Sequence, residues 1–89
     1  MGYYFAMKRS VYFAKFQTSE PLNHLPRALD MLRRMGFDLC RVSLEVTGPA
    51  TSIINVTYEP KGDLTASNLI ERIRQMQGVE NLESGRTLE

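Results

Sequence analysis

The spacing of apolar residues switches repeatedly along this chain between the two-residue repeat of a strand and the three-to-four-residue repeat of a helix. Read from the amino terminus, the order is strand, helix, strand, strand, helix, strand. The predicted strands cover residues 10–18, 38–46, 51–58 and 79–84. Because turn residues separate these segments, few arrangements of the chain satisfy the whole pattern.

Two helices are predicted between the strands. In the first, Asn23 is the expected N-cap, Pro26 falls in the first turn, and Gly36 ends the helix in a left-handed conformation. In the second, Asp63 or Thr65 is the expected cap. The apolar positions expected to face the core are Leu25, Ala28, Leu29, Met31, Leu32 and Met35 in the first helix, and Leu69, Ile70, Ile73 and Met76 in the second.

The segment Asp38–Val46 alternates between apolar and polar residues. Its apolar set is Cys40, Val42, Leu44 and Val46, and we expect Leu29, Val42 and Ile73 to share one interior. Right-handed crossovers and short connections favour one solution. The predicted fold is α+β, a ferredoxin-like βαββαβ sandwich whose four-stranded antiparallel sheet has two helices on one face. The other face is expected to carry Lys15, Arg41, Ser43, Glu45, Asn55 and Thr57.

Length and charge limit the function further. We expect one domain over residues 10–85, with residues 1–9 as an extension (an extra strand or a disordered segment) and residues 86–89 as a tail, such as a cloning scar. Eleven basic residues against ten acidic ones favour neither nucleic acid nor a membrane as a partner. A single cysteine without a recognisable signal peptide favours the cytoplasm. Since a chain this short buries a small core, we expect a homodimer or another partner.

The sequence offers little reactive chemistry. His24 is expected to be solvated, and Cys40 is expected to be a small core residue, so no nucleophile has a base beside it. One histidine and one cysteine do not form a soft metal site, and no cofactor is expected. Phe13 and Arg41 on the open sheet face leave an RNA-binding module as a remote alternative. The chain is therefore predicted not to be an enzyme.

Two stretches resemble a known family. HLPRALDMLRRMGFDLCRVSLEV ends its helix in the corner Arg34-Met35-Gly36-Phe37, and Asp38-Leu39 begins the next strand, as in ACT domains. NLIERIRQMQGVENLES is similar to the second helix and last strand of acetolactate synthase regulatory subunits. The resemblance covers about residues 10 to 84 and points to the short, single-domain class of those subunits.

The resemblance implies a non-catalytic regulatory subunit in branched-chain amino-acid biosynthesis. Such a subunit forms a homodimer and binds the large, thiamine-diphosphate-dependent catalytic subunit, and it holds no cofactor itself. A branched-chain amino acid would bind where two copies meet, at positions that correspond to Asn23, Asp38 and Leu39. The alternative within the same resemblance is a free-standing amino-acid sensor.

Overall fold

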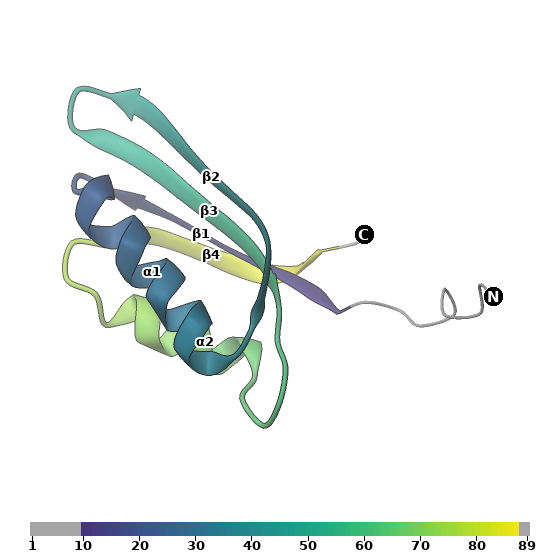
Figure 1. Ribbon diagram of the computed structural model, residues 1–89. Coiled ribbons are helices and arrows are strands. Elements are labelled where there is room, and N and C mark those ends of the chain that lie inside the picture. Colours follow the sequence, from purple (N-terminus) through teal and green to yellow (C-terminus); the bar gives the residue numbers. More distant parts are fainter. Residues whose placement is uncertain (1–9, 88–89) are drawn as a thin grey trace.

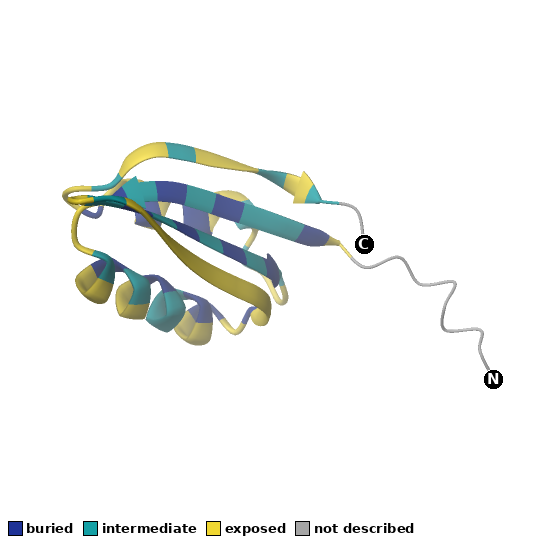
Figure 2. Ribbon diagram, turned by 90° about the horizontal axis from the view of Figure 1, so that it is seen from above, coloured by how far each residue is buried: buried dark blue, intermediate teal, exposed yellow. Residues whose placement is uncertain are grey.

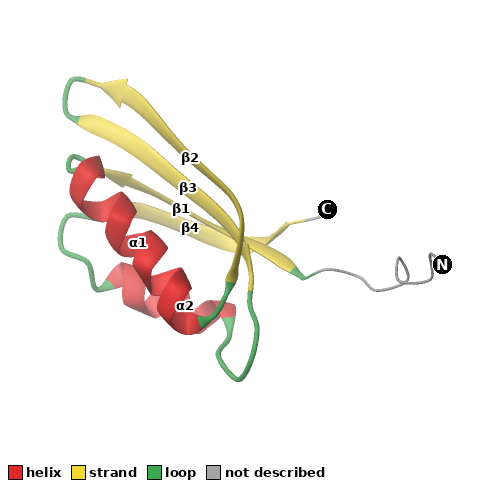
Figure 3. Cartoon of the chain, in the orientation of Figure 1, coloured by secondary structure: helices red, strands yellow, loops and turns green. Residues whose placement is uncertain are grey.

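A computed structural model describes residues 10–87 and shows six elements in the predicted order (Figure 1). They are β1 (Val11–Thr18), α1 (Pro21–Met35), β2 (Asp38–Gly48), β3 (Thr51–Glu59), α2 (Ala66–Arg74) and β4 (Glu80–Thr87). The strands form one antiparallel sheet in the order β2-β3-β1-β4. Both helices lie against one face of the sheet (Figure 3), so the predicted βαββαβ sandwich is confirmed.

The two central strands alternate between the faces of the sheet. Ala14 pairs with Val56 and Phe16 with Ile54, and all four are buried under the helices. Lys15, one residue along, pairs with Asn55 on the open face. A strand places successive side chains on opposite faces, so this register fixes the helix side and the open side of the whole sheet.

The core lies between the sheet and the helices. Tyr58 is fully buried at one end of this core. The Tyr58 ring stacks on Phe37 and on Tyr12, with 5.7 Å and 6.2 Å between the ring centroids. Buried residues of both helices complete the core, namely Ala28, Leu32, Met35, Leu69, Ile70 and Ile73.

Helix α1 begins earlier than the sequence predicts. Glu20 is the N-cap, and its carbonyl oxygen accepts the backbone N–H groups of Asn23 at 3.1 Å and of His24 at 2.9 Å. Pro21 occupies the first helical position, where its missing N–H costs nothing. The prediction that Asn23 caps the helix is wrong, and Pro26 lies inside the helix.

The predicted end of α1 and the predicted start of α2 are both confirmed. Gly36 ends α1 with φ 75°, in the left-handed region. Thr65 is the N-cap of α2, and its backbone N–H donates to Asn68 Oδ1 at 2.7 Å. Within residues 10–87, neither helix is long and apolar enough to cross a membrane.

Strand β2 differs most from the prediction. Cys40, expected in the core, is exposed, and every β2 residue before Gly48 is exposed as well (Figure 2). Val42 and Leu44 pair with Val56 and Ile54, so they do face the helix side. They remain exposed because the helices cover the other three strands and leave this outer strand bare (Figure 1). Val42 is therefore absent from the buried core that contains Ile73 and borders Leu29.

The opposite edge strand, β4, is longer than predicted and less regular. Its pairing with β1 is interrupted by a register shift between Lys15 and Gln17. Asn81 has φ 52°, a left-handed conformation that breaks regular strand geometry. The predicted extension at residues 1–9 lies outside the described residues, as do residues 88–89.

Candidate functional site

The turn between β1 and α1 is held by a buried histidine. His24, predicted to be solvated, is 1% exposed. Its Nδ1 lies 2.6 Å from Thr18 Oγ1, and its Nε2 lies 2.9 Å from the backbone oxygen of Gln77. The prediction is wrong because the covering segment, the turn after α2, comes 53 residues later in the sequence.

The partners of His24 connect three segments of the chain. The oxygen of Gln77 only accepts hydrogen bonds, so Nε2 carries the proton. Nδ1 shares a hydrogen bond with the Thr18 hydroxyl, whose oxygen accepts the Glu20 N–H at 2.8 Å. This chain of bonds joins the end of β1, the start of α1 and the turn before β4. The imidazole is therefore a structural link that fixes where α1 begins.

A single chain does not bring the three predicted effector-binding residues together. Asn23 lies in the first turn of α1, whereas Asp38 and Leu39 begin β2, beyond the other end of that helix. A 15-residue helix separates them by roughly 20 Å at 1.5 Å per residue. Asp38 forms an ion pair with Lys61 at the start of β2.

The exposed side chains on the helix side of β2 form an apolar strip, which we call the β2 edge. Its members are Leu39 (47% exposed), Val42 (39%), Leu44 (40%) and Val46 (71%). Leu22 on the neighbouring helix α1 is 86% exposed. Apolar surface that lies together on a sheet edge is typical of an interaction site, because an edge strand also has unpaired backbone groups.

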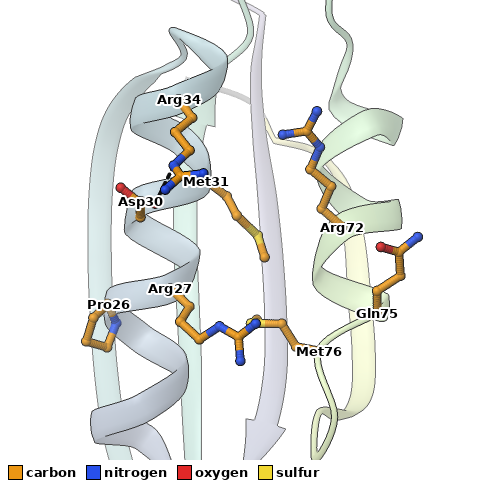
Figure 4. Close-up of a pocket in the computed structure, with 8 residues that line it drawn as sticks. All are labelled: Pro26, Arg27, Asp30, Met31, Arg34, Arg72, Gln75 and Met76. Carbon is orange, nitrogen blue, oxygen red and sulfur yellow. Dashed lines mark ion pairs between the residues drawn. The ribbon is translucent and has the colours of Figure 1, made fainter.

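A groove of about 640 Å³ runs between the two helices on their outer side (Figure 4). Arg27 and Arg34 line it from α1, Arg72 lines it from α2, and Met31 and Met76 lie between them. Arg34 is paired with Asp30 at 2.7 Å. A hydrogen bond from Arg33 to the same carboxylate lowers the pKa of Asp30 below its usual value. No local sequence pattern predicts this groove, because its residues alternate with core positions on two separate helices.

The open sheet face brings Phe13 and Arg41 into one shallow depression of about 440 Å³, with Lys15 and Glu83 beside them. The neighbouring β3 positions on this face are Ile53, Asn55 and Thr57, so no second aromatic ring lies next to Phe13. Residues 10–87 contain no group of three or more histidine, cysteine, aspartate or glutamate side chains placed to hold a metal ion.

No protein-family profile matches the sequence, and no curated protein matches it. Solved structures do match the fold. The C-terminal domain of the MgtC protein from Mycobacterium tuberculosis superimposes with a TM-score of 0.75 at 9% identity, over 92% of each chain. The ACT domain from GTP pyrophosphokinase of Chlorobium tepidum superimposes with a TM-score of 0.68 at 12% identity, over 86% of this chain and 99% of that domain. The chain has an ACT-like fold.

The ACT-like fold alone does not specify a function. The de novo designed protein Ferredog-Diesel matches the same architecture with a TM-score of 0.58 at 17% identity, over 89% of this chain and 87% of that one. A designed scaffold and natural domains thus share this topology, so function has to be argued from surfaces and sites.

Proposed function

We propose that this ACT-like domain is a non-catalytic regulatory subunit that works as a homodimer joined along the β2 edge. The observation that carries the proposal is the exposure of β2, an outer strand of 11 residues that has a neighbouring strand, β3, on one side only and that presents four exposed apolar side chains. Pairing two such strands satisfies their backbone groups and covers the apolar strip.

The sequence of β2 is complementary to itself about Ser43. In an antiparallel pair centred on this residue, Arg41 lies opposite the partner's Glu45, and Glu45 lies opposite the partner's Arg41. On the other face, Val42 lies opposite the partner's Leu44. Opposite charges and apolar side chains directly across two strands stabilise the pair. The charge pattern therefore favours a second copy of this chain as the strand that pairs with β2.

The same pairing assembles the effector-binding residues that a single chain keeps apart. It places the partner's Asp38 beside Gly48, at the end of the sheet where Val46 pairs with Ser52 and Ser52 with Thr18. Helix α1 starts at that end, so Asn23 of one copy approaches the partner's Asp38 and Leu39. Each interface would hold two equivalent sites.

The proposed effector is an amino acid with a branched side chain. The Asp38–Lys61 ion pair offers a carboxylate for an amino group and an ammonium for a carboxylate. Leu39, at the end of the β2 edge, offers an apolar surface for the side chain of the ligand. By the resemblance of the sequence, the regulated partner is the large subunit of acetolactate synthase. The alternative is an amino-acid sensor that acts without that enzyme.

Two measurements test the proposal. Thermal melts with valine, leucine, isoleucine and other amino acids should show a rise in Tm, because a ligand at 100 times its Kd adds about 2.7 kcal/mol of stability. Asp38→Asn should abolish the rise, and Asp63→Asn, in the loop before α2, is the matched control. A flat screen would exclude the amino-acid effector.

Mixing the protein with the large subunit of acetolactate synthase should produce a complex with raised activity. No co-elution and no activation would reject the acetolactate synthase role. A positive melt screen together with that result would support the free-standing sensor.

A further inference from the structure

The positive charge of the two helices is not balanced within them, although the whole chain is nearly neutral. Their basic residues are all arginines, Arg27, Arg33, Arg34, Arg72 and Arg74, and their only acidic residues are Asp30 and Glu71. The chain has a net charge of +1, so the remaining residues are acidic on balance. The helix layer is consequently a basic surface on a protein without a large overall charge.

The arginines of this layer fall into two groups. Arg33 and Arg34 pair with Asp30, and Arg74 pairs with Glu71. Arg27 and Arg72 have no carboxylate partner among the described residues. These two side chains come from different helices and line the same groove (Figure 4). Asp30 lines this groove as well, but its two carboxylate oxygens are paired with Arg33 and Arg34, so among the described residues no carboxylate of the helix layer pairs with Arg27 or Arg72.

The groove has the size and lining of a small-ligand site. Its volume of about 640 Å³ is within the range of pockets that hold drug-sized molecules. Met76 is buried and Met31 is partly buried between the arginines, so the floor is apolar. Thioether side chains are flexible and adapt to flat or irregular apolar groups. The site therefore combines unpaired guanidinium groups with an apolar base.

We propose that the groove between α1 and α2 binds a small phosphorylated molecule, whose phosphate lies between Arg27 and Arg72 and whose apolar part rests on Met31 and Met76. A phosphate group carries close to two negative charges at neutral pH, so it balances two unpaired guanidinium groups where a carboxylate balances one. The planar guanidinium also matches phosphate oxygens with two parallel hydrogen bonds. Exposed arginine side chains change rotamer readily, so both can turn toward one anion.

This site is separate from the proposed effector site. The groove lies on the outer side of the helices, whereas Asp38 and Leu39 lie on β2. A ligand bound there would bridge α1 and α2 within one chain, and it would not require a second copy. Dimerisation and anion binding can therefore be tested independently.

The experiment is a titration of the protein with pyrophosphate, ADP and citrate at constant ionic strength, followed by amide chemical shifts and by Tm. The probes that carry phosphate should shift amides of residues 26–34 and 72–76 and raise Tm by several degrees. Equal affinity for pyrophosphate and ADP would show that the phosphate alone is recognised. Tighter binding of ADP would show that the methionine floor contributes.

Two double variants with the same loss of charge complete the test. Arg27→Gln with Arg72→Gln should weaken phosphate binding by about tenfold or more, because charged hydrogen bonds are lost. Arg33→Gln with Arg74→Gln removes two paired arginines from the same helices and should leave binding nearly unchanged.

The proposal would be overturned if no phosphate probe bound, if both double variants lost binding equally, or if citrate bound as tightly as the phosphates. Binding of an acidic peptide in place of every small probe would show that the groove is a protein-docking surface.

Discussion

The imidazole Nδ1 of His24 lies 2.6 Å from the hydroxyl oxygen of Thr18, and the same ring donates through Nε2 to the backbone of Gln77. One side chain thus ties the start of α1 to the turn that follows α2. Two groups, the Thr18 hydroxyl and the Gln77 carbonyl oxygen, are bonded directly to the ring, so each loses this partner if the ring is removed.

His24→Ala should lower the free energy of unfolding by about 2–4 kcal/mol, because it leaves buried polar groups unsatisfied and creates a cavity. Thr18→Val should lower the free energy of unfolding by about 1–2 kcal/mol, because it leaves buried polar groups unsatisfied. The double variant should cost less than the sum, since both changes remove the same bond. Urea unfolding of the four proteins measures this coupling, and strict additivity would contradict the network.

Gly78 lies against the same ring. It has φ 96°, and a Cβ added there would lie 3.1 Å from His24 Cε1. Gly78→Ala should therefore destabilise the protein by about 1–3 kcal/mol through backbone strain and crowding. Gly36→Ala is the control, because its φ of 75° gives the same type of strain while its Cβ would meet nothing within 4 Å. Equal losses in the two variants would argue against contact with His24.

Tyr58 carries a buried hydroxyl with no hydrogen-bond partner among the described residues. Burial, and to a smaller extent the nearby Tyr12, raises the pKa of Tyr58 to about 12. Since the folded state holds this proton more tightly than the unfolded state, stability is retained below pH 10 and is lost as pH rises from about 10 to 12. Tyr58→Phe should remove that part of the loss.

At pH 8, Tyr58→Phe should be neutral or stabilising by up to about 1 kcal/mol, because no hydrogen bond is broken and a desolvated hydroxyl is removed. Tyr12→Phe, at a half-buried ring, is the comparison. Chemical unfolding at pH 8 and pH 11 distinguishes the variants. A large destabilisation at pH 8 would mean that the hydroxyl has a partner.

The proposed β2 pairing depends on two symmetric contacts between Arg41 and Glu45. Arg41→Glu places like charges across the interface twice, so it should weaken dimerisation by several-fold to roughly tenfold. Adding Glu45→Arg should restore it. Lys15→Glu, which reverses a charge on the same face two strands away, should have little effect. Analytical ultracentrifugation gives the dissociation constants. A monomer at every concentration would contradict the pairing.

Local signals in the sequence predict much of the fold. Gly36 and Thr65 end and start their helices as expected, and Leu69, Ile70 and Ile73 lie in the core. The predicted start of α1 is too late, because Asn23 and Pro26 also satisfy the rules for a first helical turn. Only the hydrogen bonds to the Glu20 carbonyl oxygen show that the turn forms earlier.

The surfaces were harder to predict than the elements. Alternation in β2 indicates which side chains share a face, and this is confirmed for Val42 and Leu44, which pair with buried β3 residues. It is not confirmed for Cys40, which lies at a register shift between Leu39 and Arg41. Alternation does not indicate whether a helix covers that face. The burial of His24 and the placement of Arg27 and Arg72 along one groove likewise depend on distant segments packing together, which no local pattern contains.

The irregular geometry of β4 has a consequence for how far assembly can proceed. With its register shift beside Gln17 and its left-handed Asn81, that edge offers a poor template for another strand. If strands can pair at the β2 edge of the sheet but not at the β4 edge, no third copy can add once two copies have joined. The distortion at the far border of the sheet would thus limit association to a closed pair and prevent an endless ribbon.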